Sequence, residues 1–183
     1  MAYTMENQLL DVAGDLGWSF EEAVNERLSE MIGPSVPERF RRLVREVLLR
    51  LPGSWDYSYA TWRVEADGER IPPTHFPPLG WKEVRDICYP EYVIKITPSE
   101  MAGWSDEACS WTLAQSFAYI AFKLLLRLSE DGGAGESLFS RSDEQAHAEI
   151  TRTIALWWGF ESELKAYEKE VCSQKKDIRR MIQ

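Results

Sequence analysis

Residues 92–128 constrain the fold most, because they join a short strand to a long apolar helix. β-branched residues crowd positions 92–97 and predict a strand, which Pro98 ends because proline cannot donate to a sheet ladder. Ser105 and the two acids after it are a good helix start. Apolar side chains then recur at spacings of two to four residues. The sequence therefore predicts a central helix that is buried on most sides.

The chain before this stretch is expected to be helical. A first helix at residues 6–13 is closed by Gly14 and Gly17. A second begins at a capping box, in which Ser19 and Glu22 bond to each other's backbone amides, and ends at Gly33. Pro37 opens a third helix with an arginine row on its outer face. We expect that row to be a solvated face paired with local glutamates, with phosphate binding as the alternative: Arg39, Arg41, Arg42, Arg45 and Arg50.

The middle of the chain predicts a small sheet. Residues 57–66 alternate as a strand does, and Asp67 with Gly68 signals a hairpin with a return at residues 69–71. A proline-rich covering loop follows, and residues 81–88 are expected to form a helical turn. The predicted fold class is α+β, mostly helical, with a small sheet of two to four strands packed on the long central helix.

Two helices are expected after the central one. A capping box at residues 142–145 opens a helix to Trp158, which Gly159 ends, and Glu161 starts a last helix that runs to the C-terminus.

The bulk properties exclude several classes of protein. No apolar run approaches the roughly 20 residues of a membrane helix. The N-terminus lacks the features of a signal peptide, so we expect a cytoplasmic protein with no membrane association. Three widely spaced cysteines indicate reduced thiols. A net charge of −9 disfavours direct nucleic-acid binding. Two explanations of this charge remain, which are an acidic surface that occupies a basic partner and a simple contribution to solubility.

The strand, the acidic turn and the buried helix resemble the core of minimal zinc metallopeptidases, the zincins of gluzincin type. In that family the helix carries His-Glu-x-x-His, with two zinc ligands and a catalytic base. In this chain Gln115 and Tyr119 stand at the ligand positions and Ser116 stands at the base position. Residues 154–160 resemble the family's closing segment, and the acids that precede it are replaced: Ile150, Thr151 and Arg152. The resemblance therefore implies a degenerate member that lacks the metal-binding residues.

This resemblance also suggests an organisation for the chain. Residues 1–36 would form an N-terminal helical segment, residues 37–165 a zincin-like core and residues 166–183 a C-terminal helix. Tyr119 is expected to fill the space that a metal would need. Ser116 is expected to be packed or hydrogen bonded to the backbone.

Other chemistry has few candidates. Asp143 lies one helical turn before His147, an acid–imidazole pair that would hold a metal or move a proton, although such pairs are common on helix surfaces. His75, Cys88, Cys109 and His147 have no ligand-motif spacing. No nucleotide-binding or nucleophile-elbow motif occurs, so no cofactor and no metal are expected.

The sequence thus favours a non-catalytic, zincin-like domain that acts as a protein-binding or regulatory module, a pseudoenzyme with a protein partner. Two alternatives remain. One is an acidic inhibitor or decoy of a nucleic-acid-handling protein. The other is a hydrolase with a non-standard site around Asp143, Glu144, His147 and Tyr119.

Overall fold

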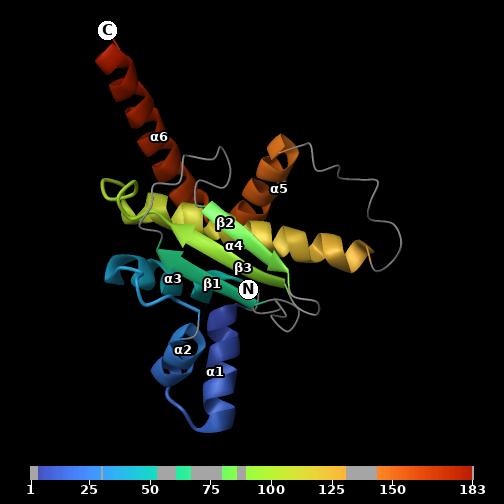
Figure 1. The fold of residues 1–183 in the computed structure, drawn as a ribbon. Coiled ribbons are helices and arrows are strands. Elements are labelled where there is room, and N and C mark those ends of the chain that lie inside the picture. Colours follow the sequence, from blue (N-terminus) through green and yellow to red (C-terminus); the bar gives the residue numbers. More distant parts are fainter. Residues whose placement is uncertain are drawn as a thin grey trace.

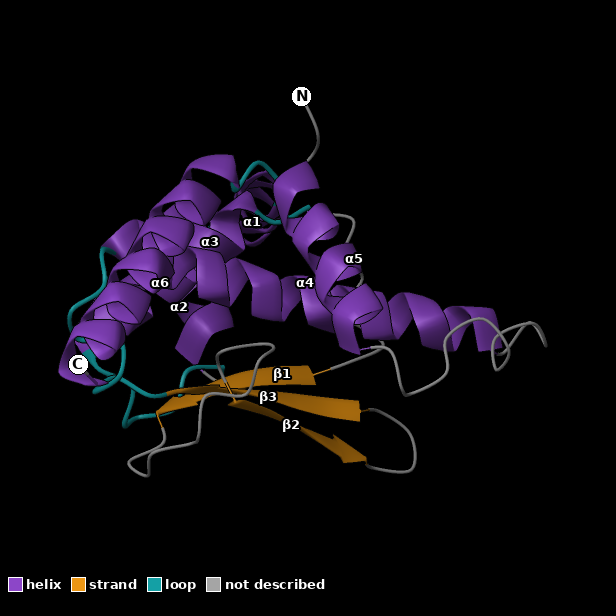
Figure 2. Ribbon diagram, turned by 90° about the horizontal axis from the view of Figure 1, so that it is seen from above, coloured by secondary structure: helices purple, strands orange, loops and turns teal. Residues whose placement is uncertain are grey.

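Helices form one layer of the molecule and a small sheet forms the other (Figures 1 and 2). The computed structural model describes residues 4–29, 31–52, 61–66, 80–85, 90–130 and 144–182. Within these residues lie six helices and three strands, which confirms the predicted α+β class, mostly helical with a small sheet. The elements in chain order are α1 (Met5–Leu16), α2 (Phe20–Ser29), α3 (Glu38–Arg50), β1 (Thr61–Ala66), β2 (Gly80–Arg85), β3 (Pro90–Ile96), α4 (Asp106–Glu130), α5 (Glu144–Trp157) and α6 (Glu161–Ile182).

Helix α4 is the centre of the fold, as the sequence predicts. Every residue from Ala108 to Phe122 is buried, so no side of this part of the helix faces water. The sheet covers one side, where Trp62 of β1 meets Phe117 edge to face with ring centroids 4.8 Å apart. Helices α3, α5 and α6 contact other sides of α4.

The sheet has the strand order β1-β3-β2, with β1 parallel and β2 antiparallel to β3. Strand β3 confirms the predicted strand at residues 92–97. Strand β1 falls within the predicted strand at residues 57–66, and the hairpin at residues 67–71 lies outside the described residues. The helical turn predicted at residues 81–88 is wrong, because residues 80–85 form β2. The edge of β3 supplies backbone partners that outweigh the weak local preference of so short a segment.

The first helix is longer than predicted. It passes through Gly14 to Leu16, since a single glycine inside a helix costs only about 1 kcal/mol. Gly17 ends it in the left-handed conformation, with φ of 67°. The predicted capping box of α2 is confirmed: the Ser19 amide donates to the Glu22 carboxylate at 2.7 Å, and the Glu22 amide donates to the Ser19 hydroxyl at 3.3 Å.

Helix α2 ends at Ser29, so the prediction that it reaches Gly33 is wrong. Residues 31–33 instead pair with β1: the Val64 amide donates to the Met31 carbonyl and the Gly33 amide donates to the Val64 carbonyl, each at 2.7 Å. A side chain at position 33 would place its Cβ 3.2 Å from the Val64 carbonyl oxygen, so this close approach favours glycine. Non-local backbone pairing has replaced the last helical turn.

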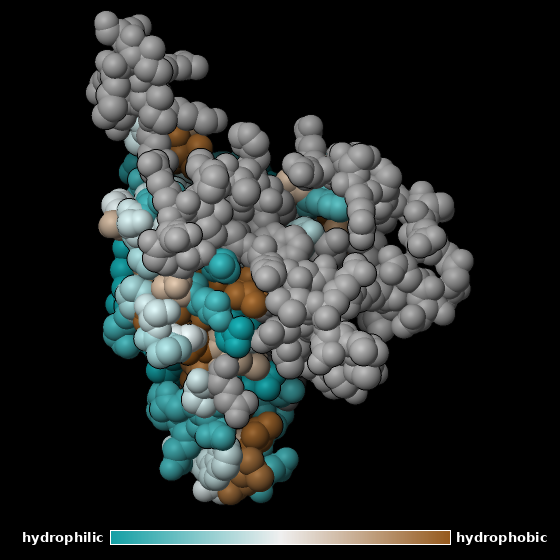
Figure 3. Space-filling view, in the orientation of Figure 1, coloured by the Kyte–Doolittle hydropathy of each residue, from teal (hydrophilic) through white to brown (hydrophobic). Residues whose placement is uncertain are grey.

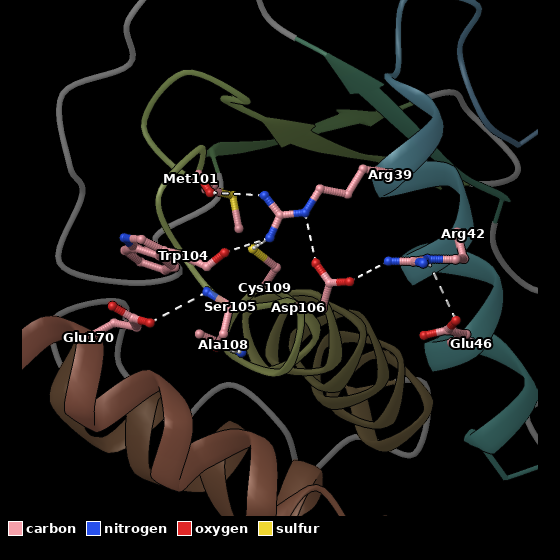
Figure 4. Close-up of polar contacts among 10 residues, drawn as sticks. All are labelled: Arg39, Arg42, Glu46, Met101, Trp104, Ser105, Asp106, Ala108, Cys109 and Glu170. Atoms are coloured by element: carbon pink, nitrogen blue, oxygen red, sulfur yellow. Dashed lines mark hydrogen bonds and ion pairs between the residues drawn. The ribbon is translucent and has the colours of Figure 1, made fainter.

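The arginines of α3 keep one expected local pair, Arg42 with Glu46, but their shorter ion pairs join α3 to other helices, which corrects the expectation of local partners. Arg39 donates through Nε to Asp106 at 2.7 Å and through its guanidinium to the Trp104 carbonyl (Figure 4). Arg42 donates to the other oxygen of the same carboxylate, while its local ion pair with Glu46 is longer, at 3.8 Å. Asp106 is thus held by two arginines at the first turn of α4.

Two further arginines of α3 reach other helices. Arg45 pairs with Glu21 of α2. Arg50 pairs with Glu163 of α6, donates to the Gly159 carbonyl at 2.9 Å and lies over the Phe160 ring at 3.9 Å. Helix α3 therefore contacts α2, α4 and α6 through charged side chains, in addition to its buried apolar face.

One cluster of buried apolar side chains runs through the described part of the chain. It includes Met5 and Val24 from the N-terminal helices, Phe117 from α4, and Leu164 from α6. The N-terminal helices therefore pack on the same core as the sheet and α4. The predicted division at residues 36 and 165 stays a prediction.

Truncation of Phe117 tests the position of α4. Phe117 is fully buried against Trp62, so Phe117→Ala should lower the free energy of unfolding by about 3–5 kcal/mol, as other large aromatic truncations do. Urea titration of the wild type and the variant measures this loss. An unchanged unfolding midpoint would contradict the central position of α4.

The Arg50–Glu163 pair predicts a pH dependence of stability. Burial by itself raises the pKa of Glu163, but hydrogen bonds from Arg50, the backbone and Ser162 outweigh it and lower the pKa below its ordinary 4.5. A lowered folded pKa stabilises the fold above 4.5, and this contribution disappears as the pH falls through the folded pKa. Glu163→Gln should therefore cost about 1–3 kcal/mol at neutral pH and progressively less in acid. Unfolding titrations at several pH values check this, and a cost independent of pH would refute it.

Candidate functional site

The start of α4 is held firmly from several directions. The Ser105 hydroxyl accepts a hydrogen bond from the Ala108 amide at 3.2 Å, which confirms the predicted cap. The Ser105 amide in turn donates to Glu170 of α6 (Figure 4). With Asp106 held by two arginines, the register of α4 against α3 and α6 is fixed at this end.

The three motif positions on α4 lie in packed surroundings. Gln115, Ser116 and Tyr119 are 7%, 2% and 8% exposed. The Ser116 hydroxyl donates to the Thr112 carbonyl at 2.9 Å, so the predicted bond to the backbone is confirmed. Such a bond to the preceding turn satisfies the hydroxyl within its own helix. The Tyr119 ring contacts the Phe122 ring at a centroid distance of 6.5 Å.

Of the second candidate, the predicted acid–imidazole pair, the structure describes only the imidazole of His147. Asp143 lies outside the described residues. The His147 ring is half-buried and meets the Phe122 ring edge to face, with centroids 5.2 Å apart. Its Nε2 atom is buried and has no hydrogen-bond partner within the described residues. The pair stays a prediction.

The positions at which the resemblance would place acids have structural contacts instead. The buried Thr151 hydroxyl donates to the His147 carbonyl at 2.9 Å and lies 3.1 Å from the Ala148 carbonyl. Arg152 is exposed and pairs with Glu168 of α6 at 2.8 Å. Ile150 is half-buried. Arg152 therefore joins α5 to α6.

The remaining metal-ligand candidates do not come together. Cys109 lies near the start of α4, whereas His147 meets Phe122, which lies thirteen residues later and about 20 Å further along the same helix. His75 and Cys88 lie outside the described residues. Across the described ranges, no group of three or more His, Cys, Asp or Glu side chains is placed to hold a metal ion.

Two hollows flank helix α2. A groove of about 630 Å³ lies between α2 and α3 and is lined by four arginines: Arg39, Arg41, Arg42 and Arg45. Each of them already donates to a carboxylate or a backbone carbonyl, so their charge is largely used within the protein. The second hollow, of about 440 Å³, is lined by Trp18, Glu22, Asn25, Glu26 and Ser29. The sequence singled out the arginines of the first hollow but not the second hollow, for which the spacing of its residues along α2 was the one visible signal.

Exposed apolar side chains gather near the second hollow. In the part of the chain that the structure describes, five large apolar side chains are exposed. Four of them lie within a nine-residue stretch of α1 and the turn after it: Leu10, Val12, Leu16 and Trp18. The fifth, Trp157, is 89% exposed on α5. Four of the five thus lie in the α1–α2 hairpin (residues 4–29), where Figure 3 shows an apolar patch among hydrophilic residues at the lower end of the molecule.

Comparison with known protein families, with curated proteins and with solved structures finds no match to this chain. None of the described helices is both long enough and apolar enough to cross a bilayer.

The buried position of Cys109 predicts selective thiol chemistry. Burial raises the pKa of the Cys109 thiol to about 11, whereas Cys172 is exposed. Since the thiolate is the reactive form, Cys172 should react quickly with a disulfide reagent and Cys109 only after unfolding. A Cys88→Ser variant removes the third thiol, and thiol counting before and after denaturant makes the measurement. Rapid reaction of both thiols in the native variant would show that the start of α4 is open.

Proposed function

We propose that this chain is a non-catalytic, zincin-like domain that acts as a protein-binding or regulatory module. The observation that carries this proposal is the burial of Gln115, Ser116 and Tyr119 on α4. At the positions where the resemblance places two zinc ligands and a base, the chain has an amide, a hydroxyl and a phenol packed into the core.

Peptide hydrolysis by zinc needs several features at once. Protein ligands must hold the ion, a coordination position must stay open for water, and a base must take the proton. Neutral amide and phenol groups are far poorer zinc ligands than imidazole. The Ser116 hydroxyl is occupied by the Thr112 carbonyl. This packing supports a binding module over a peptidase.

A binding role also needs a surface, and the α1–α2 hairpin supports one. Exposed apolar side chains are concentrated there, and such patches commonly mark sites of protein association. The hairpin projects away from the sheet and from the far end of α6 (Figure 1). It also carries acidic side chains, which suits the narrower alternative of an acidic inhibitor or decoy.

The hydrolase alternative has less support. His147 contacts the aromatic ring of Phe122, and no described carboxylate bonds to its ring. An imidazole that acts as a general base needs a proton within hydrogen-bond reach in the reacting complex. The described surroundings of His147 therefore favour packing.

Metal content and peptidase activity test the proposal. We expect purified wild type to contain no stoichiometric zinc and to show no chelator-sensitive hydrolysis of casein-derived peptides. The triple variant Gln115→His, Ser116→Glu, Tyr119→His restores the helix motif, but it should stay inactive. Ile150 and Arg152 replace the acids of the family pattern, so the third ligand would still be missing.

Two results would contradict this view. Robust hydrolysis by the wild type, abolished by chelator, would make the protein an enzyme. Activity in the triple variant alone would mean that a third ligand is present elsewhere in the chain. Arg152→Ala is the matched control, since it removes the ion pair with Glu168 and leaves the motif positions unchanged, and it should also be inactive.

A further inference from the structure

Helix α2 presents one continuous stripe that does not pack on the core. Its buried side consists of Ala23, Val24 and Leu28. The second hollow is lined by Trp18, which precedes the helix, and by four residues of α2, of which the last three lie three, four and seven positions after the first: Glu22, Asn25, Glu26 and Ser29. On a helix these intervals place side chains along one face. We call this stripe the hairpin hollow.

The hairpin hollow combines an aromatic ring with carboxylates. Trp18 is 43% exposed at its start, next to Leu16, which is 55% exposed. Glu22 is held by Ser19, and these hydrogen bonds lower the pKa of its carboxyl, so it is ionised at neutral pH. No described residue pairs with the Glu26 carboxylate. An indole face and nearby carboxylates together favour a cationic side chain.

The net charge of the whole hairpin also favours a cationic partner. Residues 4–29 contain six acidic residues and a single basic one, Arg27: Glu6, Asp11, Asp15, Glu21, Glu22 and Glu26. Of the acids in or beside the stripe, Glu21 is the one that pairs with another helix, through Arg45 of α3. A basic partner would therefore meet a complementary field over this surface, which raises its rate of association.

We propose that the hairpin hollow binds a basic, amphipathic segment of a partner protein. An apolar side chain of that segment packs on Leu16 and Trp18, and an Arg or Lys side chain lies between the Trp18 ring and the carboxylates of Glu22 and Glu26. This proposal rests on the proposed function, since it names the surface and the chemistry of the partner. The neighbouring arginine groove has no binding role here, because its guanidinium groups are already bonded within the protein.

The basic end of α6 in the same molecule is not the occupant. It lies at the opposite end of the molecule from the hairpin (Figure 1). A second copy could still bring such a segment to the hollow, and the oligomeric state distinguishes that case.

The test follows the indole N–H signal of Trp18 by NMR in the full chain, assigned as the signal that Trp18→Phe removes. The probe is a synthetic helical peptide of about 15 residues made of Leu, Ala and Arg, and its control carries Glu in place of every Arg. We expect a saturable shift of the Trp18 signal with the basic peptide and none with the acidic one. The apparent affinity should fall as salt is added.

Matched variants separate the hollow from general charge attraction. Glu22→Gln with Glu26→Gln keeps the capping box, because Gln replaces Glu there, and should weaken binding about three- to tenfold. Glu107→Gln with Glu149→Gln removes the same charge from exposed positions outside the hairpin and should leave the affinity unchanged. Trp18→Ala should weaken binding about tenfold or more, whereas Trp157→Ala should not.

Several results would overturn the proposal. They are an unmoved Trp18 signal, equal weakening by the two glutamine pairs, and equal binding of the acidic peptide. A sedimentation profile that shows self-association, lost in Trp18→Ala, would assign the surface to a second copy and so also overturn it. None of these outcomes bears on zinc binding or hydrolysis, so the docking proposal can fail while the proposed non-catalytic function stands.

Discussion

The structure depends on one constraint, which is that α4 has no exposed side from Ala108 to Phe122. A helix that is apolar around its circumference must be covered around its circumference, and a single neighbouring layer cannot do this. The sheet therefore covers one side through the Trp62–Phe117 contact, and α3, α5 and α6 cover the others. The order of elements in space follows from this requirement.

The same constraint decides what the motif positions can do. Gln115, Ser116 and Tyr119 belong to the buried part of α4, so their polar groups must be satisfied within the protein. Ser116 meets this need through its own helix. The polar contacts that align α4 lie instead at its start, where Asp106 accepts from Arg39 and Arg42. Chemistry at the middle of α4 would require the core to open.

Local signals were enough to predict much of the fold. The strand of β3, the cap at Ser105 and the capping box at Ser19 depend on residues close together in sequence, and all are present. Pairing between strands was not predictable: β2 forms because the neighbouring β3 offers an edge, and α2 stops early because Val64 pairs with Met31 and Gly33. Val64 lies 33 and 31 residues after these two partners, so no local pattern shows that contact.

Side-chain partners at long range were missed for the same reason. The arginine row of α3 looks solvated in sequence, yet Arg39 and Arg50 find carboxylates 67 and 113 residues away. The burial of Ser116 could be predicted from the apolar helix around it. The hairpin hollow could not, because the exposure of Trp18 depends on how far the hairpin projects from the core. Only the spacing of four and eight residues from Trp18 to Glu22 and Glu26 was visible.

Native-state hydrogen exchange of the α4 amides tests the central claim most directly, which is that the middle of this helix is closed core and not a site. Amides of elements that open only with the whole fold exchange with the free energy of global unfolding. We expect the amides from Trp111 to Ile120 to exchange with that global value, measured independently by urea titration. Exchange of the Gln115, Ser116 and Tyr119 amides through a much smaller local opening, while the rest of α4 stays protected, would contradict it.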